Sequence, residues 1–160
     1  ACLKMNNDLE RIGDLAVNIA KRSIAISEFA DGDPIMLAFH PMMDMAQTMI
    51  KKVLDALIDL NADLALQVMA EDDALDALNK KVHADVNALI KTNPAKVDYY
   101  INLLSVSRHL ERIGDYATNI AEDVIYLVNG RIVRHRTGPT LEEFKHRKDN
   151  DLTDISIPIQ

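Results

Sequence analysis

The amino-acid sequence predicts an all-α protein, an antiparallel up-and-down helix bundle joined by short loops. Three observations lead to this prediction. Hydrophobic residues make up 48% of the 160 residues but aromatic residues only 4%, and Ala, Leu and Met are abundant. Such a composition favours helices over strands. Apolar residues recur at helical spacing, and no segment up to residue 130 alternates convincingly with the period of two that strands require.

The apolar spacing predicts four helices, at residues 2–29, 41–61, 63–90 and 94–128. The turn-forming residues 31–34 end the first helix. Pro41 suits the first turn of the second helix. A break near Asn61 separates the second helix from the third, and residues 91–94 stop the third. Gly130, directly after Asn129, is typical of a helix C-terminus and closes the fourth.

One twelve-residue segment occurs twice. Residues 9–20 read LERIGDLAVNIA and residues 110–121 read LERIGDYATNIA, with ten of twelve positions identical at an offset of 101. This repeat indicates a duplicated unit. Its second copy lies in the last helix of a three-helix unit formed by residues 41–129. By symmetry we expect the first copy to be the last helix of a similar unit, whose two preceding helices would lie upstream of residue 1.

We therefore expect three parts in the chain. Residues 1–34 are the last helix of an N-terminally truncated first three-helix repeat, and residues 35–130 are a complete second repeat. Residues 131–160 form a tail of mixed charge, with 6 basic and 5 acidic side chains against 12 and 20 in residues 1–130. In the tail, Thr140 and Glu143 predict the cap of a short helix at about 141–148, and the remainder is expected to be extended or disordered.

Each copy of the repeat carries two carboxylates one helical turn apart. These are Glu10 and Asp14 in the first copy, and Glu111 and Asp115 in the second. On a helical wheel both pairs lie away from the apolar stripe. Like charges at this spacing repel by a few tenths of a kcal/mol. Because both copies keep the pair, the charge itself is expected to have a use.

A third acidic pair, Asp72 and Asp76, precedes His83 on the same face of the third predicted helix. If the third and fourth helices pack side by side, these carboxylates converge with Glu111 and Asp115. An all-oxygen site of this kind suits hard cations such as Mg²⁺, Mn²⁺, Ca²⁺ or iron. The alternative is a solvated acidic face without a ligand, and the spacing alone does not exclude it.

The other residues of the repeat predict packing contacts. A glycine in a helix interior costs about 1 kcal/mol relative to alanine. We therefore expect Gly13 and Gly114 to allow a close approach between helices. Arg11 and Arg112 are expected to form ion pairs with neighbouring acidic side chains.

Several classes of protein are disfavoured. The one cysteine, Cys2, cannot form an internal disulfide, which favours a reducing compartment. The formal net charge of −7 argues against nucleic-acid binding. A ferritin-like di-metal oxidase needs Glu-x-x-His on each of two core helices, whereas this spacing occurs once, from Glu143 to His146 in the tail. No glycine-rich phosphate loop is present either.

The two copies of LERIGD-x-A-x-NIA resemble the PhoU family of phosphate-signalling regulators, and so do residues 63–76 (DLALQVMAEDDALD) and 130–135 (GRIVRH). The resemblance covers about residues 1–136 and implies a fold of two three-helix repeats. It also implies a cytoplasmic, non-enzymatic regulator. Such proteins act between a phosphate ABC transporter and a membrane-bound sensor histidine kinase, and repress the phosphate-starvation response when phosphate is ample.

The resemblance further implies metal binding, because Glu/Asp-x-x-x-Asp motifs of this family hold metal ions, in some members as multinuclear clusters. Carried over, it implies Mg²⁺, Mn²⁺ or iron at two sites: Glu10 with Asp14, and Asp72, Asp76, Glu111 with Asp115. We expect membrane contact only through partners, and self-association because the first helix lacks neighbours. Two alternatives stay open: a metal-free helical interaction module, and the regulatory domain of a phosphate transporter.

Overall fold

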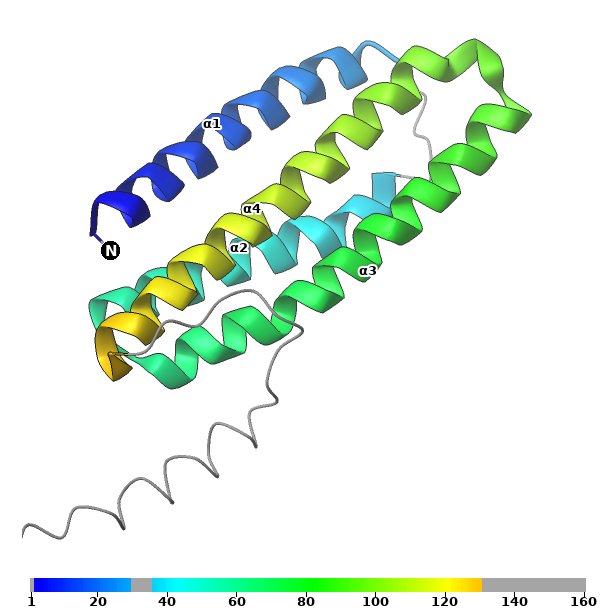
Figure 1. Cartoon of the computed structure of the whole chain (residues 1–160). Coiled ribbons are helices and arrows are strands. Elements are labelled where there is room, and N and C mark those ends of the chain that lie inside the picture. Colours follow the sequence, from blue (N-terminus) through cyan, green and yellow to red (C-terminus); the bar gives the residue numbers. More distant parts are fainter. Residues whose placement is uncertain (1, 30–35, 131–160) are drawn as a thin grey trace, which may run out of the picture.

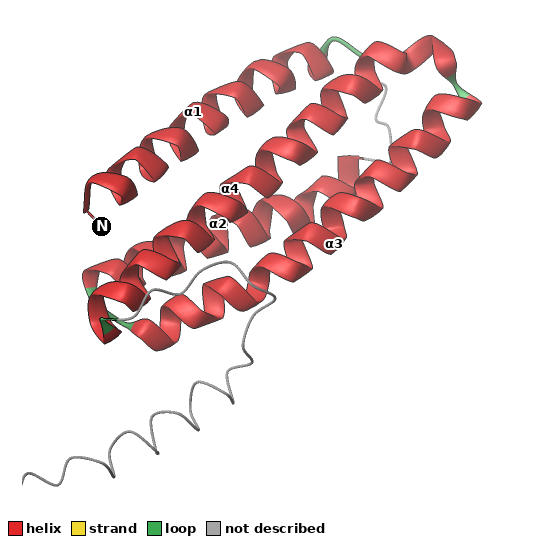
Figure 2. Ribbon diagram, viewed as in Figure 1, coloured by secondary structure: helices red, strands yellow, loops and turns green. Residues whose placement is uncertain are grey.

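The computed structural model describes residues 2–29 and 36–130. Its helices are α1 (Cys2–Ser27), α2 (Met36–Ile58), α3 (Ala62–Thr92) and α4 (Val97–Asn129), with a 3₁₀ turn, η1 (Pro94–Lys96), before α4. Every regular element in these residues is helical, which confirms the all-α class (Figure 2). Successive helices run in opposite directions, as expected of an up-and-down bundle (Figure 1). No described helix combines the length and apolarity needed to cross a membrane.

The central element is α4. It packs together with α2 and α3, which also contact each other, while α1 lies along another side of α4 (Figure 1). The core contains fully buried side chains from all three packed helices, among them Met42, Met49, Val68, Leu75, Leu103 and Ile120. From α1, Met5, Ile12 and Leu15 are buried. Removal of this apolar surface from water is the main force that holds the helices together.

Two helix ends confirm their sequence predictions. Asn61 caps α3, because its side-chain Oδ1 accepts a hydrogen bond of 3.0 Å from the backbone N–H of Leu64. Gly130 ends α4 in the left-handed conformation, with φ of 63°, and its N–H donates to the carbonyl of Tyr126. That conformation is easy for glycine, which has no Cβ.

The start of α2 differs from the prediction. The helix begins at Met36, so Pro41 lies inside it and not in its first turn. Phe39 is only 3% exposed and shares a buried face with Met42 and Ala46. A proline inside a helix removes one backbone hydrogen bond. The burial of Phe39 nevertheless stabilises the helical residues that precede Pro41. The turn at 31–34, the short helix at 141–148 and the rest of the tail lie outside the described residues.

The contact between α1 and α4, called the seam below, brings the two copies of the repeat face to face. The helices are antiparallel (Figure 1). Near one end, Lys4 Nζ donates to Asp123 at 3.3 Å, and near the other, Arg22 Nη1 donates to Asn102 Oδ1 at 3.0 Å. The equivalent residues Ile12 and Ile113 are both buried about midway between these contacts. The seam therefore has an approximate two-fold axis, which relates each residue to the one 101 positions away.

Candidate cation site between α3 and α4

The packing of α3 against α4 brings acidic side chains from both helices together. Glu111 of α4 is half-buried, and Asp115, Asp76 and His83 all lie close enough to act on its charge. Asp72 is beside the same helix, because its Oδ1 would lie 3.4 Å from a Cβ placed on Gly114. The structure thus places Asp72, Asp76, Glu111 and Asp115 along one α3–α4 face, as the helical spacing predicts. We call these four carboxylates the acidic face.

Gly114 sets how closely the two helices approach. A Cβ at this position would overlap Cδ2 of Leu75, which is buried, and would lie 3.6 Å from Cε of Met49. Only glycine allows this approach without a shift in the core, which confirms the prediction for Gly114. The same prediction is wrong for Gly13, because no described atom would come within 4 Å of a Cβ there.

The acidic face concentrates negative charge around Glu111. Burial raises the pKa of Glu111, and the carboxylates of Asp115 and then Asp76 raise it further. Arg108 and His83 act in the opposite direction but do not reverse the shift. A carboxyl group whose ionised form is disfavoured by its neighbours would be stabilised by a cation placed among them.

The donors are arranged as pairs and do not form a finished coordination shell. Among residues 2–29 and 36–130, no three His, Cys, Asp or Glu side chains lie close enough together to hold one metal ion. Asp76 Oδ2 lies 3.9 Å from Nζ of Lys80, an exposed pair that contributes little to stability. Asp72, Asp76, Glu111 and Asp115 are all partly exposed. Rotation of these side chains, or bridging waters around a hydrated Mg²⁺, would be needed to complete a site.

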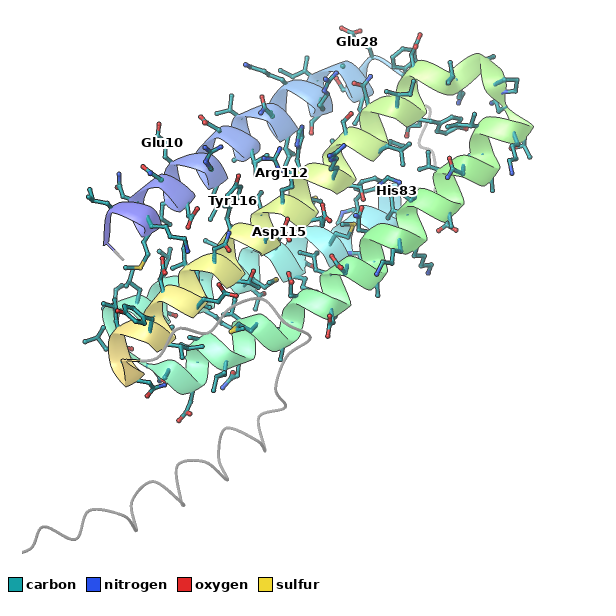
Figure 3. All side chains as sticks on the ribbon, in the orientation of Figure 1. Glu10, Glu28, His83, Arg112, Asp115 and Tyr116 are labelled. Carbon is teal, nitrogen blue, oxygen red and sulfur yellow. The ribbon has the colours of Figure 1, made fainter. Side chains whose placement is uncertain are left out.

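The first copy of the repeat places its carboxylates in a different environment. Glu10 and Asp14 are exposed on α1, which packs chiefly against α4. In Figure 3, Glu10 points away from the other helices. Within the described residues, the predicted first site therefore consists of two exposed carboxylates on one helix.

The two repeat arginines have different partners: Arg11 acts on the charge of Asp8, whereas the predicted pairing with an acid is not seen for Arg112. Arg112 Nη2 donates to Tyr116 Oη at 3.3 Å, and Figure 3 shows both side chains between α1 and α4. Neither Arg11 nor Arg112 takes part in an ion pair in the part of the chain that the structure describes. The wheel places Arg112 about 100° from Glu111, and this turns the guanidinium toward α1 and away from the acidic face.

Two buried titratable groups in the seam were not predicted. Asp8 is 7% exposed and its Oδ2 has no hydrogen-bond partner, and burial raises its pKa. His109 occupies the equivalent position on α4, and its buried Nδ1 also lacks a partner. Burial, followed by the charges of Arg112, Arg22 and Arg108, lowers the pKa of His109. Asp8 and His109 each lie one residue before a copy of the repeat, so the offset of 101 aligns them. This alignment is the feature of the sequence that could have identified both residues.

These features define a class of protein: a helical bundle built on a repeated helix, with paired carboxylates on one helix–helix face. Comparison with known protein families matches residues 39–124 to the PhoU domain. The chain belongs to the PhoU family, as the two repeat segments indicated.

Relatives from distant bacteria match most of the chain. It is 38% identical over 128 residues to a phosphate-specific transport system accessory protein PhoU homolog of Pseudomonas aeruginosa, covering 80% of this chain and 53% of the relative. It is 32% identical over 129 residues to a homolog of Thermotoga maritima, covering 81% and 56%. The chain thus spans about half the length of the curated relatives it matches.

Solved structures show the same fold. The crystal structure of PhoU from Pseudomonas aeruginosa superposes with a TM-score of 0.77 at 37% identity, over 80% of this chain and 61% of that one. The phosphate transport system regulatory protein PhoU from Streptococcus pneumoniae superposes with a TM-score of 0.74 at 27% identity, over 82% and 61%. These matches confirm the helical bundle architecture.

Proposed function

We propose that this chain is a non-enzymatic regulator of phosphate uptake and phosphate-starvation signalling in the cytoplasm. It acts between a phosphate ABC transporter and a sensor histidine kinase, and binds a divalent or iron cation on the acidic face. Family membership supports the regulatory role, since the relatives are named accessory proteins of a phosphate-specific transport system. The exposed apolar side chains of α1, including Val17 and Ile24, support self-association.

The observation that carries the cation-binding part of the proposal is the convergence on Glu111. Carboxylates from two different helices, Asp76 of α3 and Asp115 of α4, act on one partly buried carboxyl group. A solvated acidic face would gain stability by separating these charges or replacing one with lysine. The close packing at Gly114 instead holds the two acidic helix faces together.

Metal content tests the proposal directly. The purified chain is incubated with Mg²⁺, Mn²⁺ or Fe²⁺, desalted, and analysed by mass spectrometry alongside Glu111→Gln/Asp115→Asn. The matched control is Glu10→Gln/Asp14→Asn, which removes the same motif from α1. We expect near-stoichiometric metal in the parent and the control, and loss in the α4 variant. Binding of the three proteins to subunits of the phosphate ABC transporter and to the sensor histidine kinase then tests the partners.

A metal-free helical interaction module is the second candidate. It is favoured by the lack of any three-ligand group among the described residues. Metal-free protein in all three samples would support this candidate, and would leave the acidic face as a solvated surface. Equal metal loss in the α1 and α4 variants would contradict the assignment to the α3–α4 face, because among the described residues the acidic face surrounds the second copy of the motif and not the first. The alternative of a regulatory domain of a phosphate transporter is compatible with both metal-bound and metal-free protein, so metal content does not test it.

A further inference from the structure

A groove follows the seam between α1 and α4. It is lined by Asn18, Lys21, Arg22 and Ala25 of α1 and by His109 of α4, and has a volume of about 430 Å³. This volume falls within the range of small-molecule binding sites. The groove and the acidic face lie on different flanks of α4, one beside α1 and the other beside α3. We call the groove beside α1 the basic groove, because Lys21 and Arg22 line it.

The groove concentrates positive charge in an acidic protein. The chain has a formal net charge of −7, and residues 1–130 contain four arginines. Three of them, Arg22, Arg108 and Arg112, act on the charge of His109, and no carboxylate is among the groups that do. Within the described residues, neither these three arginines nor Lys21 forms an ion pair. Lys21 and Arg22 thus line the groove itself, and Arg108 and Arg112 add positive charge close to its His109, although Arg108 also acts on the charge of Glu111.

Arg22 and Arg112 each make only one side-chain hydrogen bond among the described residues. Arg22 donates one hydrogen bond of 3.0 Å to Asn102, and Arg112 donates one of 3.3 Å to Tyr116. A guanidinium has five N–H donors, so most of the donors of both side chains have no hydrogen-bond partner among the described residues. Beside them, Nδ1 of His109 is buried without a partner.

The positive charge of the groove is not a feature of the repeat itself, as the other end of the seam shows. There the equivalent positions are acidic: Lys21, Arg22 and His109 correspond to Glu122, Asp123 and Asp8. The acidic end holds a cation of its own, because Lys4 Nζ lies 3.3 Å from Asp123. The same backbone arrangement thus carries opposite charges at its two ends, and the two cations that line the basic end, Lys21 and Arg22, form no ion pair among the described residues. An anion from solution would complete the basic end.

We propose that the basic groove binds a phosphate-type oxyanion, either as inorganic phosphate or as the terminal phosphates of a small molecule. Arginine binds phosphate oxygens through two parallel N–H···O bonds. Several cations around one pocket favour a ligand with two or more negative charges over a single carboxylate. The inference goes beyond the proposed function and does not depend on it, because it uses neither the acidic face nor a protein partner.

Calorimetric titration of the full chain with inorganic phosphate, pyrophosphate and ATP tests the inference. EDTA is included so that no phosphate binds through a metal ion. The test variants are Arg22→Gln/Arg112→Gln and, because Lys21 is exposed and cannot disturb the core, Lys21→Gln. The matched control is Lys51→Gln/Lys81→Gln, which removes two exposed cations from α2 and α3. Circular dichroism verifies that every variant is folded.

We expect saturable binding of at least one of the three ligands. Binding should weaken about tenfold to a hundredfold in the double arginine variant, less in Lys21→Gln, and less than about threefold in the control. Binding of inorganic phosphate itself identifies the free anion as the ligand, and binding of ATP or pyrophosphate alone identifies terminal phosphates. The inference is overturned if no ligand saturates, if the groove variants bind like the parent, or if the control weakens equally.

Discussion

The two copies of the repeat have nearly the same sequence, but different neighbours cover them. Both bury one face in the seam. The other face of α4 is also buried, with Thr118 only 2% exposed and Ile125 fully buried. The equivalent residues of α1, Val17 and Ile24, are 53% and 67% exposed. The repeat therefore accounts for the contact between its own two copies, whereas burial of the remaining face depends on which helices lie next to it.

The same difference applies to the carboxylates of the two copies. Glu111 and Asp115 face acidic side chains of α3, and Glu111 is partly buried among them. Glu10 and Asp14 are exposed on a helix without such a neighbour among the described residues. An identical motif thus has different chemical environments in the two copies. A second helix, and not the motif alone, creates the candidate site.

The largest expected effect compares Ile125→Ala with Ile24→Ala. Ile125 is fully buried, so its truncation leaves a cavity and should lower the free energy of unfolding by about 2–5 kcal/mol. Truncation of the exposed Ile24 should change it by less than about 0.5 kcal/mol. Urea unfolding of both variants and the parent measures the difference. A comparable loss in Ile24→Ala would show that this face of α1 is covered in solution, and the contrast between the copies would disappear.

Smaller effects are expected at the two glycines, and the changes in the free energy of unfolding should be opposite in sign to each other. Gly114→Ala places a methyl group against the buried Leu75, which should lower the free energy of unfolding by about 1–3 kcal/mol. Gly13→Ala meets nothing within 4 Å in the described structure and should raise it by about 0.5–1 kcal/mol through helix propensity.

The background variant Leu75→Ala provides the control for this comparison. If overlap with Leu75 causes the loss, Gly114→Ala should cost much less in that background, and the cycle of four proteins gives the coupling. An undiminished cost would place the steric conflict elsewhere. The effect of Gly13→Ala should be the same in both backgrounds, since no described atom of α3 is near it.

Much of the fold is predictable because it depends on local patterns. Helical spacing identifies the four helices, and the short-range chemistry of Asn61 and Gly130 marks two of their ends. The start of α2 is not predictable in this way. Pro41 is a local signal for a first turn, but Phe39 is buried by tertiary packing, and packing outweighs the local preference.

The candidate sites divide along the same line. The acidic face follows from side-chain spacing once α3 and α4 are neighbours, so the wheel could place Glu111 and Asp115 on one flank. The basic groove depends on the antiparallel register of α1 along α4. That register pairs Arg22 with Asn102, eighty positions apart. The spacing of residues within one helix does not predict such a pairing. For the same reason the side chain of Arg112, which turns toward the seam, was wrongly expected to pair with an acid.

The smallest predicted effect concerns the two ends of the seam and depends on pH. Burial raises the pKa of Asp8 in the folded protein, Asp123 adds to the shift, and Lys4 and Arg11 oppose it. The folded chain therefore keeps this proton to a higher pH than the unfolded chain. Its contribution to stability falls as the pH rises from the ordinary carboxyl pKa of about 4 through the raised value.

Asp8→Asn removes this titration while keeping the size of the side chain. Relative to the parent, the variant should be more stable by on the order of 1 kcal/mol at pH 7, because the parent then buries an ionised carboxylate with one unpartnered oxygen. At pH 3 the advantage should vanish, since Asp8 is then protonated in both states. The control is Asp14→Asn on the exposed face of α1, which measures the effect of removing one carboxylate that is not buried. If Asp8→Asn were less stable than the parent at pH 7, attraction to Lys4 would outweigh burial, and the acidic end of the seam would be a satisfied ion cluster in contrast to the open basic groove.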